Sequence, residues 1–397
     1  MKAQAFKDHL ENNLIPFWSQ LKDEEFGGFY GYVKGDGTVL KEEVKGVILN
    51  SRILWFFSQA YIQLKDEKLL EMAKHAYKFL VEHCIDTSYG GVFWSLNYKG
   101  EIEDDIKHCY NQAFAIYALS TYYEASVDKN ALDYAYDIYR IIEEKCHDDG
   151  GYLEAFYRDF TKADNDKLSE NGIMADRTMN TLLHVFEAYT QLYKVDHNDS
   201  VGNCLKAILD SFKDKIYNAE KEMCEVFFDN DYNSLIDLDS YGHDIEASWL
   251  INRACDVLDD AEYSEKMLPI IVGLADGCYK NSMDESVSKI SDMLAAMNME
   301  IENGVINKTK VWWIQAEAVT GYYNAYEQNP EKVEYRDISE KVWNFINKYF
   351  VDEKHGEWVE NIEDLNNIDY TQALVQPWKC PYHNGRMCLE MMKRLEK

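Results

Sequence analysis

The chain has little that would interrupt helices, cross-link it, or hold a metal or a phosphate. It contains only 5 prolines among 397 residues, which favours helix because proline breaks helix interiors. Its 9 cysteines are odd in number and scattered, without a CxxC pair, so we expect free thiols that pack as small hydrophobic side chains. HxH, HExxH, GxSxG and the glycine-rich phosphate and dinucleotide motifs are also absent. We therefore expect no metal site and no cofactor.

Long hydrophobic runs and positive charge are scarce as well. The sequence has no stretch of 18 uncharged apolar residues, so no segment is predicted to span a membrane. It begins MKAQAFKDHLENNLIPFW, which is charged and amphipathic and lacks the apolar core of a signal peptide, so we expect a cytoplasmic protein. A formal net charge of −30 without a basic stripe argues against nucleic-acid binding.

What the chain has in abundance is apolar helical periodicity. Residues 69–84, 110–125, 179–193 and 338–350 place apolar side chains at i, i+3, i+4 and i+7. Glycine pairs at 27–28, 90–91 and 150–151 precede a few residues rich in aromatics, as in GGFYGYV, which is typical of a helix end followed by a turn and a short hairpin. Because no low-complexity linker separates these units, we expect one domain over residues 1–397.

Six of the apolar helices begin with polar or aromatic side chains, at intervals of 59 to 70 residues. These starts centre on Arg52, Asn111, Asn180, His243, Trp313 and His383. The helices are apolar nearly all round, as expected for helices buried on every side, and the repeat is too long for an ordinary solenoid. We predict an all-α (α/α)6 barrel of twelve helices with short β-hairpins in its connecting loops. The six helix starts would then meet at one pocket.

The segment YGHDIEASW, residues 241–249, places His243 and Glu246 three residues apart on one helix face. A carboxylate in contact with an imidazole fixes its tautomer and strengthens it as a base. A His–Glu pair at this spacing is often a structural ion pair. Here it lies on an otherwise apolar face at one of the six equivalent helix starts, and this position favours a catalytic pair.

Two further helix starts carry basic side chains beside aromatic rings. WKCPYHNGRM, residues 378–387, puts His383 just after a proline with Trp378 nearby. SRILWFF, residues 51–57, holds Arg52 against an aromatic run. His383 is either a helix-capping histidine or a catalytic one, and Arg52 is either the partner of a buried glutamate or a ligand for a substrate oxygen.

The remaining helix starts suit a sugar. Trp312 and Trp313 are neighbours on a helix, so we expect one to face the pocket and the other to pack in the core. Flat aromatic faces beside amides and carboxylates bind sugar rings, although core packing would also explain the tryptophans. Asn180 and His184 share a face at i and i+4, and Tyr110 opens another inner helix. Surface or loop positions are predicted for the histidines at 9, 75, 83, 147, 197 and 355.

Two histidines on different inner helices, with Arg52 nearby, suit proton transfer next to a carbonyl group. Inverting a carbon α to an aldehyde requires that its proton be taken from one face and that a proton be returned to the other. The planar enediolate between these steps must be held by a cation or by hydrogen-bond donors. Histidine is suited to both steps because near neutral pH it serves first as a base and then as an acid.

Taken together, the motifs KGVILNSRILWFFSQAY, KHCYNQAFAIYAL, YGHDIEASWL, VWWIQAEAV and WKCPYHNGRM resemble those of bacterial cellobiose 2-epimerases, within the N-acylglucosamine 2-epimerase superfamily. The resemblance runs essentially from end to end. It implies an (α/α)6 barrel that reversibly inverts C2 of the reducing-end glucose of β-1,4-linked disaccharides without a cofactor. Cellobiose would give glucosyl-mannose, and lactose would give epilactose. We expect a monomer whose partner is the disaccharide substrate.

The resemblance also implies roles for individual residues. His243 and His383 would be the two acid/base groups on opposite faces of C2, Glu246 would orient His243, and Arg52 would stabilise the enediolate. Which histidine abstracts the proton depends on the direction of the reaction. Trp378 would stack near the glycosidic linkage or the non-reducing sugar. The subsite for the reducing sugar would be lined by Tyr110, Asn180, His184 and one of Trp312 and Trp313.

Other functions remain compatible with the sequence. Inverting glycoside hydrolases also use helical barrels, and Glu246 and Glu317 could be their two carboxylates. A related N-acylglucosamine 2-epimerase or mannose isomerase would act on a single sugar. A non-catalytic sugar-binding or scaffold protein would bind without exchanging any proton.

Overall fold

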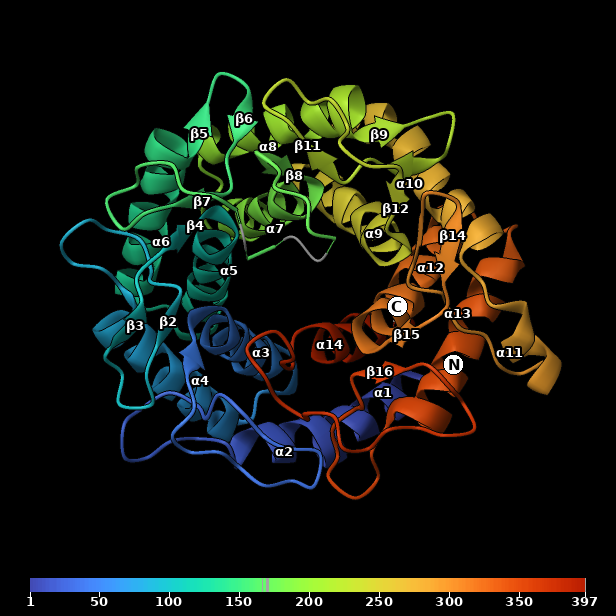
Figure 1. Cartoon of the computed structure of the whole chain (residues 1–397), viewed down its shortest axis with the longest axis horizontal. Coiled ribbons are helices and arrows are strands. Elements are labelled where there is room, and N and C mark those ends of the chain that lie inside the picture. Colours follow the sequence, from blue (N-terminus) through green and yellow to red (C-terminus); the bar gives the residue numbers. More distant parts are fainter. Residues whose placement is uncertain (166, 169–170, 397) are drawn as a thin grey trace.

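The computed structural model describes residues 1–165, 167–168 and 171–396, and its helices form two concentric rings (Figure 1). The inner ring consists of α3 (Val47–Leu64), α5 (Cys109–Ser126), α7 (Met179–Asp196), α9 (Tyr241–Leu258), α12 (Trp312–Gln328) and α14 (His383–Leu395). The outer ring consists of α1 (Ala3–His9), η1 (Leu10–Leu14) and α2 (Ile15–Ser19); α4 (Glu67–Phe79) with η2 (Leu80–Cys84); α6 (Lys129–Ile141) with η3 (Ile142–Cys146); α8 (Asp199–Ser211) with η4 (Phe212–Ile216); α10 (Ala261–Asn281); and α13 (Val333–Phe345) with η5 (Ile346–Phe350). The predicted (α/α)6 barrel is confirmed, with a short helix α11 (Glu285–Ile290) added at the periphery.

The burial of the two rings follows their sequence patterns. In α5 every residue from Cys109 to Tyr122 is buried, because the helix packs against α3, α7 and its own outer helix α6. In α6 the buried residues are Ala131, Ala135, Ile138 and Tyr139, which recur at helical spacing on one face. In this repeat the inner helix is therefore buried on every side and the outer helix is amphipathic.

Each of four inner helices ends in the same way before the chain reverses into the outer ring. Its last turn is followed by a residue in the left-handed conformation, with φ between 50° and 60°. The next residue is an Asp or Asn whose side chain accepts a hydrogen bond from the first turn of the outer helix. The left-handed residues are Lys65, Val127, His197 and Asp259, and the caps are Asp66, Asp128, Asn198 and Asp260.

Short strands join consecutive repeats around one rim of the barrel. The strand that precedes an inner helix pairs, antiparallel, with a strand from the next repeat along the chain. The bridge between Val33 and Val375 closes the ring by joining the sixth repeat to the first. The pairs are β1 (Lys45–Gly46) with β2 (Ser95–Leu96), β4 (Lys107–His108) with β7 (Ala155–Phe156), β8 (Arg177–Thr178) with β11 (Phe227–Phe228), β12 (Leu238–Asp239) with β13 (Glu300–Glu302), and β15 (Lys310–Val311) with β16 (Asn361–Ile362).

The other strands are local hairpins. They pair β2 with β3 (Ile102–Asp104), β5 (His147–Asp148) with β6 (Gly151–Tyr152), β9 (Tyr217–Asn218) with β10 (Met223–Cys224), and β13 with β14 (Val305–Asn307). The first two glycine pairs lie within short turns between bridged residues, with Lys22 opposite Phe29 and Ile85 opposite Val92, and the hairpin of β2 and β3 follows the second pair.

An ion pair recurs between the turn after an outer helix and the residue that leads into the next inner helix. Asp23 binds Lys45 at 2.6 Å, and Asp86 binds Lys107 at 3.1 Å. The pairs Asp148–Arg177, at 2.6 Å, and Asp284–Lys310, at 2.9 Å, occupy the same place in the third and fifth repeats. The fourth repeat has Asn218 and Asp239 at these two positions. We call these four ion pairs the rim pairs.

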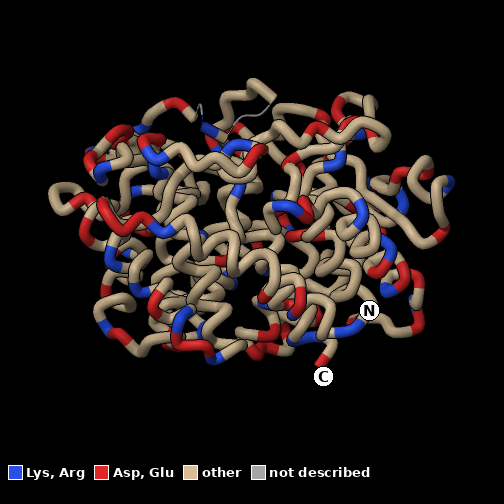
Figure 2. Tube along the Cα trace, turned by 90° about the horizontal axis from the view of Figure 1, so that it is seen from below, with Lys and Arg blue, Asp and Glu red and all other residues tan. Residues whose placement is uncertain are grey.

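The distribution of acidic residues and the state of the cysteines agree with what the composition predicts. Asp and Glu are spread around the periphery of the trace (Figure 2). All nine cysteines are free, as predicted. Within the described residues, no helix is both long enough and apolar enough to cross a membrane.

Candidate active site

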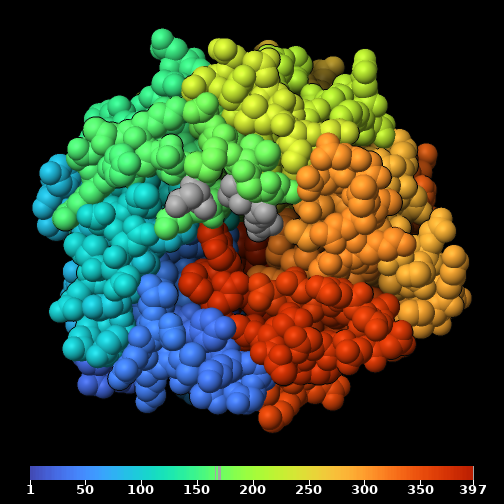
Figure 3. Space-filling view, viewed as in Figure 1, coloured from blue at the N-terminus to red at the C-terminus, as the bar shows by residue number. Residues whose placement is uncertain are grey.

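A cavity of about 380 Å³ opens at the centre of the inner ring, where the space-filling view is hollowed (Figure 3). Its size is within the usual range for small-molecule sites. All ten residues that the sequence nominated line it: Arg52, Tyr110, Asn180, His184, His243, Glu246, Trp312, Trp313, Trp378 and His383. Both adjacent tryptophans contribute to the cavity lining, but Trp312 is 3% exposed and belongs to the buried core, whereas Trp313 is only partly buried.

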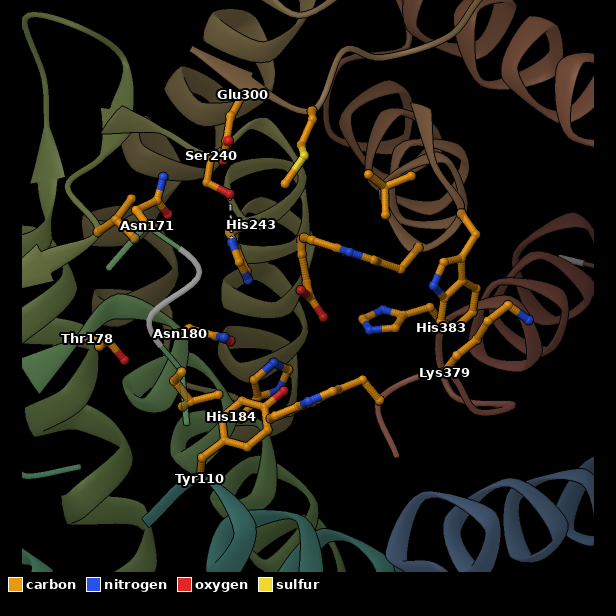
Figure 4. A pocket seen from close by; sticks show the side chains of 18 of the residues that line it. Tyr110, Asn171, Thr178, Asn180, His184, Ser240, His243, Glu300, Lys379 and His383 are labelled. Carbon is orange, nitrogen blue, oxygen red and sulfur yellow. Dashed lines mark hydrogen bonds between the residues drawn. The ribbon is translucent and has the colours of Figure 1, made fainter. Parts of the chain in front are cut away.

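Three imidazoles enter this cavity from three inner helices: His184 from α7, His243 from α9 and His383 from α14 (Figure 4). The ring of Trp313 lies close to two of them, with centroids 4.9 Å from His243 and 5.3 Å from His383. Burial lowers the pKa of all three, to about 3 for His243. Each ring is therefore neutral near pH 7 and has a nitrogen lone pair that can accept a proton.

The partners of these rings differ from the predicted ones. Nδ1 of His243 shares a 2.7 Å hydrogen bond with Oγ of Ser240, so the predicted pairing of His243 with Glu246 is replaced by one with a hydroxyl. His383 donates from Nδ1 to Glu317 at 2.7 Å, across two helices. A histidine and a glutamate three residues apart do form a pair, but at His184, whose Nδ1 lies 3.1 Å from a carboxylate oxygen of Glu187.

Below the histidines, Arg386 of α14 binds three carboxylates from three other inner helices. Its guanidinium donates to Glu187 of α7, Glu246 of α9 and Glu317 of α12, and all four side chains are at most 3% exposed. One cation thus ties four of the six inner helices together. Three buried carboxylates on a single cation leave an excess of negative charge, which favours protonation of one of them.

That proton belongs on Glu246. Glu317 accepts from three donors, Arg386, His383 and Trp249, so its carboxylate is well satisfied. Glu246 accepts from Arg386 through one oxygen, while its other oxygen has no hydrogen-bond partner within the described residues. Burial, together with the neighbouring Glu317 carboxylate, raises the pKa of Glu246 to about 8. Glu246 therefore lines the cavity as a buried carboxyl group that keeps its proton at neutral pH.

Arg52 supplies an uncompensated positive charge to the cavity. Its guanidinium donates to the hydroxyl of Tyr110 at 2.7 Å and lies over the rings of Phe114 and Tyr382, with centroid distances of 4.1 and 4.7 Å. Across the described parts of the chain, no carboxylate is within ion-pair distance of this group. The alternative that Arg52 is bound by a buried glutamate is therefore wrong, and its charge is free to stabilise an anion that forms in the cavity.

One of the six predicted helix-start residues, Asn111, does not line the cavity. Asn111 of α5 is fully buried and donates from Nδ2 to the carbonyl oxygen of Phe93 at 2.7 Å, so it holds a loop in place. Its neighbour Tyr110 faces the cavity instead. Asn180 lines the cavity, and its buried amide oxygen has no hydrogen-bond partner within the described residues. His9, predicted to lie on the surface, is buried and accepts a hydrogen bond from Trp358 at 2.9 Å.

Glu246, Glu317 and His383 place one ligand atom each within 4.8 Å of one another, a spacing that could hold a metal ion. A guanidinium nitrogen of Arg386 already binds both carboxylates, so a metal ion would compete with a cation supplied by the chain. The same arrangement disfavours a hydrolase, because hydrolytic carboxylates flank a glycosidic bond, whereas these two share one nitrogen.

Several residues of this site were missed or left without a role in the sequence reasoning. The HxxE spacing that nominated Glu246 is also present at His184 and Glu187, and would have found that pair. Arg386 lies three residues after His383, one turn further along α14, which signals a shared face. Ser240 could have been found because it is a serine directly before an inner helix, the usual position of an N-cap.

The sequence matches a known family. The sequence profile of the N-acylglucosamine 2-epimerase (GlcNAc 2-epimerase) family matches residues 28–384 of the chain. The chain therefore belongs to this family and is a carbohydrate 2-epimerase, an isomerase. A cellobiose 2-epimerase of Eubacterium cellulosolvens is 47% identical to it, with 99% of this chain and 98% of that protein covered. One from Ruminococcus albus is 44% identical, with 99% of both chains covered.

Solved structures give the same result. A cellobiose 2-epimerase of Bacillus thermoamylovorans superposes with a TM-score of 0.92 at 40% identity, covering 99% of both chains. The GH76 α-mannanase of Bacteroides thetaiotaomicron has a TM-score of 0.65 at 10% identity, which is a likeness of fold alone. The barrel is thus shared by enzymes with different chemistry, and the activity has to be argued from the site.

Proposed function

We propose that this enzyme reversibly inverts C2 of the reducing-end glucose in β-1,4-linked disaccharides, converting cellobiose to glucosyl-mannose and lactose to epilactose. The observation that carries the proposal is the placement of His243 and His383, on different helices but against one tryptophan ring, beside the free charge of Arg52. The relatives named for cellobiose epimerisation support the choice of a disaccharide.

In this mechanism the sugar ring opens first and exposes an aldehyde at C1. A neutral histidine on one side of C2 removes its proton through Nε2, and Arg52 stabilises the negative charge that develops on the enediolate oxygens. The imidazole on the other side, which is neutral in the free enzyme, must first take up a proton on Nε2, and it then delivers that proton to the opposite face of C2. Because burial lowers the pKa of both rings, each imidazolium is a strong acid in this site and returns a proton readily.

Other cavity residues bind the sugar. The flat rings of Trp312, Trp313 and Trp378 provide apolar surfaces for sugar faces, and Tyr110, Asn180 and His184 provide hydrogen bonds for hydroxyl groups. Glu246 donates a hydrogen bond to a sugar oxygen near the reacting carbon. In place of its predicted role as the partner of His243, it acts directly on the substrate.

The test is a proton NMR time course of cellobiose with the purified protein in D2O. We expect the C2 proton to be replaced by deuterium, glucosyl-mannose to appear, and the glycosidic linkage to stay intact. His243→Ala and His383→Ala should abolish inversion, while His9→Gln, at a buried histidine outside the cavity, should retain it. Release of glucose would show a hydrolase, and accumulation of a ketose as the main product would show an isomerase of the mannose isomerase type. Full inversion by either alanine variant would exclude the two-histidine mechanism.

A further inference from the structure

Ser240 stands at the N-cap of α9 but does not cap the helix. An N-cap serine or threonine normally accepts a hydrogen bond from a backbone N–H of the first turn. Thr178 does this at the equivalent position of α7, where its Oγ1 accepts from the N–H of Thr181 at 3.0 Å. The hydroxyl of Ser240 makes no such bond and instead lies 2.7 Å from Nδ1 of His243 (Figure 4). The Ser240 hydroxyl, which could have capped the helix, therefore binds the imidazole of His243 instead.

This contact determines which nitrogen of His243 meets the substrate. Because Nδ1 is bound to Ser240, Nε2 is left for the cavity. The ring is held on its other side by Trp313, and α9 approaches α12 closely at this turn: a β-carbon at Gly242 would lie only 2.6 Å from the indole of Trp313. A side chain at position 240 can thus set the rotation of the imidazole while Trp313 limits its tilt.

A hydroxyl differs from the carboxylates that hold the other two cavity histidines. Glu317 and Glu187 accept a hydrogen bond from Nδ1 of His383 and His184. A serine hydroxyl can donate or accept, so it stays bound whether Nδ1 carries a proton or not. The other ionisable groups around His243 are His184, Glu246, Glu317 and Glu300, which approach from α7, α9, α12 and β13.

We propose that Ser240 is a positioning residue for His243, holding its Nε2 against one face of C2 through every protonation state of the ring. This inference rests on the two-histidine mechanism proposed above. Its consequence is stereochemical: a defect at Ser240 impairs proton transfer on the face of C2 that His243 serves and spares the face that His383 serves.

The test compares Ser240→Ala and Ser240→Thr with the unaltered enzyme in D2O, starting from cellobiose and, separately, from glucosyl-mannose. With Ser240→Ala we expect inversion to fall about 10- to 100-fold in kcat, as is typical for groups that orient a catalytic residue, with KM nearly unchanged. For the epimer whose C2 proton faces His383, exchange without inversion should continue. For the other epimer, exchange and inversion should fall together. Ser240→Thr keeps the hydroxyl and should restore most of the rate.

Stability provides the control. Thr178→Ala should lower the melting temperature because it removes a real cap, while Ser240→Ala should leave it unchanged. Equal losses of exchange from both epimers, a change confined to KM, or a melting temperature that falls as far as in Thr178→Ala would overturn the positioning role. If the unaltered enzyme itself exchanges no C2 proton of either disaccharide, the proposed function fails instead, and the two failures are thereby distinguished.

Discussion

Replacing Arg386 with methionine should destabilise the barrel strongly and in a pH-dependent way. The side chain is 1% exposed and binds Glu187, Glu246 and Glu317, which are no more exposed than 3%. Methionine approximates the length of the arginine stem but leaves three buried carboxylates without their shared cation. The packing is thus nearly conserved, and the change isolates the charge.

The size of the effect follows from the burial of the partners. Removing one member of a buried ion pair costs about 3–5 kcal/mol, because the remaining charge is left in a medium that solvates it poorly. An unfolding entropy of about 2.1 cal/mol/K per residue gives about 1.2 °C per kcal/mol for a chain of 397 residues, so the melting temperature should fall by about 4–6 °C. The loss should be smaller in acid. Burial alone would raise the pKa of Glu187. In the unaltered protein, Arg386 and hydrogen bonds from His184 and Tyr382 hold this pKa below its usual value.

The sign of the pH dependence follows from that pKa. Without Arg386 the buried carboxylates titrate above the value of about 4.3 that they have in the unfolded chain, so the folded variant binds more protons between that pH and neutrality. Its stability therefore falls as the pH rises, and the gap to the unaltered protein widens from pH 5 to pH 8. Urea unfolding at several pH values measures this gap, and Arg140→Met, at an exposed pair with Asp137, is the control that should change little. A gap that is small, or that stays constant with pH, would refute the assignment of Arg386 as the counter-charge.

Two further changes test other parts of the structure. Burial lowers the pKa of His9 to about 4, so the folded protein binds fewer protons than the unfolded chain between pH 4 and 6.5. The protein therefore loses up to about 3 kcal/mol of stability as the pH falls through that window. His9→Gln keeps an acceptor for Trp358, so urea unfolding of this variant should be less sensitive to acid, and an unchanged pH dependence would contradict this. Trp378→Ala should raise KM for cellobiose by roughly 3- to 10-fold and leave kcat nearly unchanged, because an aromatic contact contributes about 0.5–1.5 kcal/mol; steady-state kinetics measure this, and an equal rise in KM for a single sugar would place Trp378 at the reducing ring instead.

The ring and its pocket were predictable because both follow from periodic patterns. Inner helices that are apolar all round can be buried only between other elements, and six of them with polar starts leave few arrangements other than a closed barrel. A polar side chain in the first turn of such a helix has access to the central opening. This reasoning correctly placed Arg52, His243 and His383 beside one cavity.

Partners could not be predicted in the same way, because they depend on rotation about each helix axis and on neighbouring helices. Adjacent residues of a helix point about 100° apart, so Tyr110 reaches the cavity while Asn111 is turned to a loop. Spacing suggested that Glu246 holds His243, yet Arg386, 140 residues away in sequence, binds that carboxylate instead. Contacts between distant helices leave no trace in a single sequence.

The rim pairs have a consequence for how this barrel could diversify. Each of them joins the residue two positions before an inner helix to the preceding turn, and none of their side chains lines the cavity. Side chains in the first turn of an inner helix can therefore be replaced by others of different chemistry without changing the barrel. In the fourth repeat, which carries His243, Asp239 stands where the four repeats with rim pairs have a basic residue, and burial raises the pKa of Asp239 to about 6. An Asp239→Lys variant would show whether the scaffold tolerates the basic residue of those four repeats beside His243.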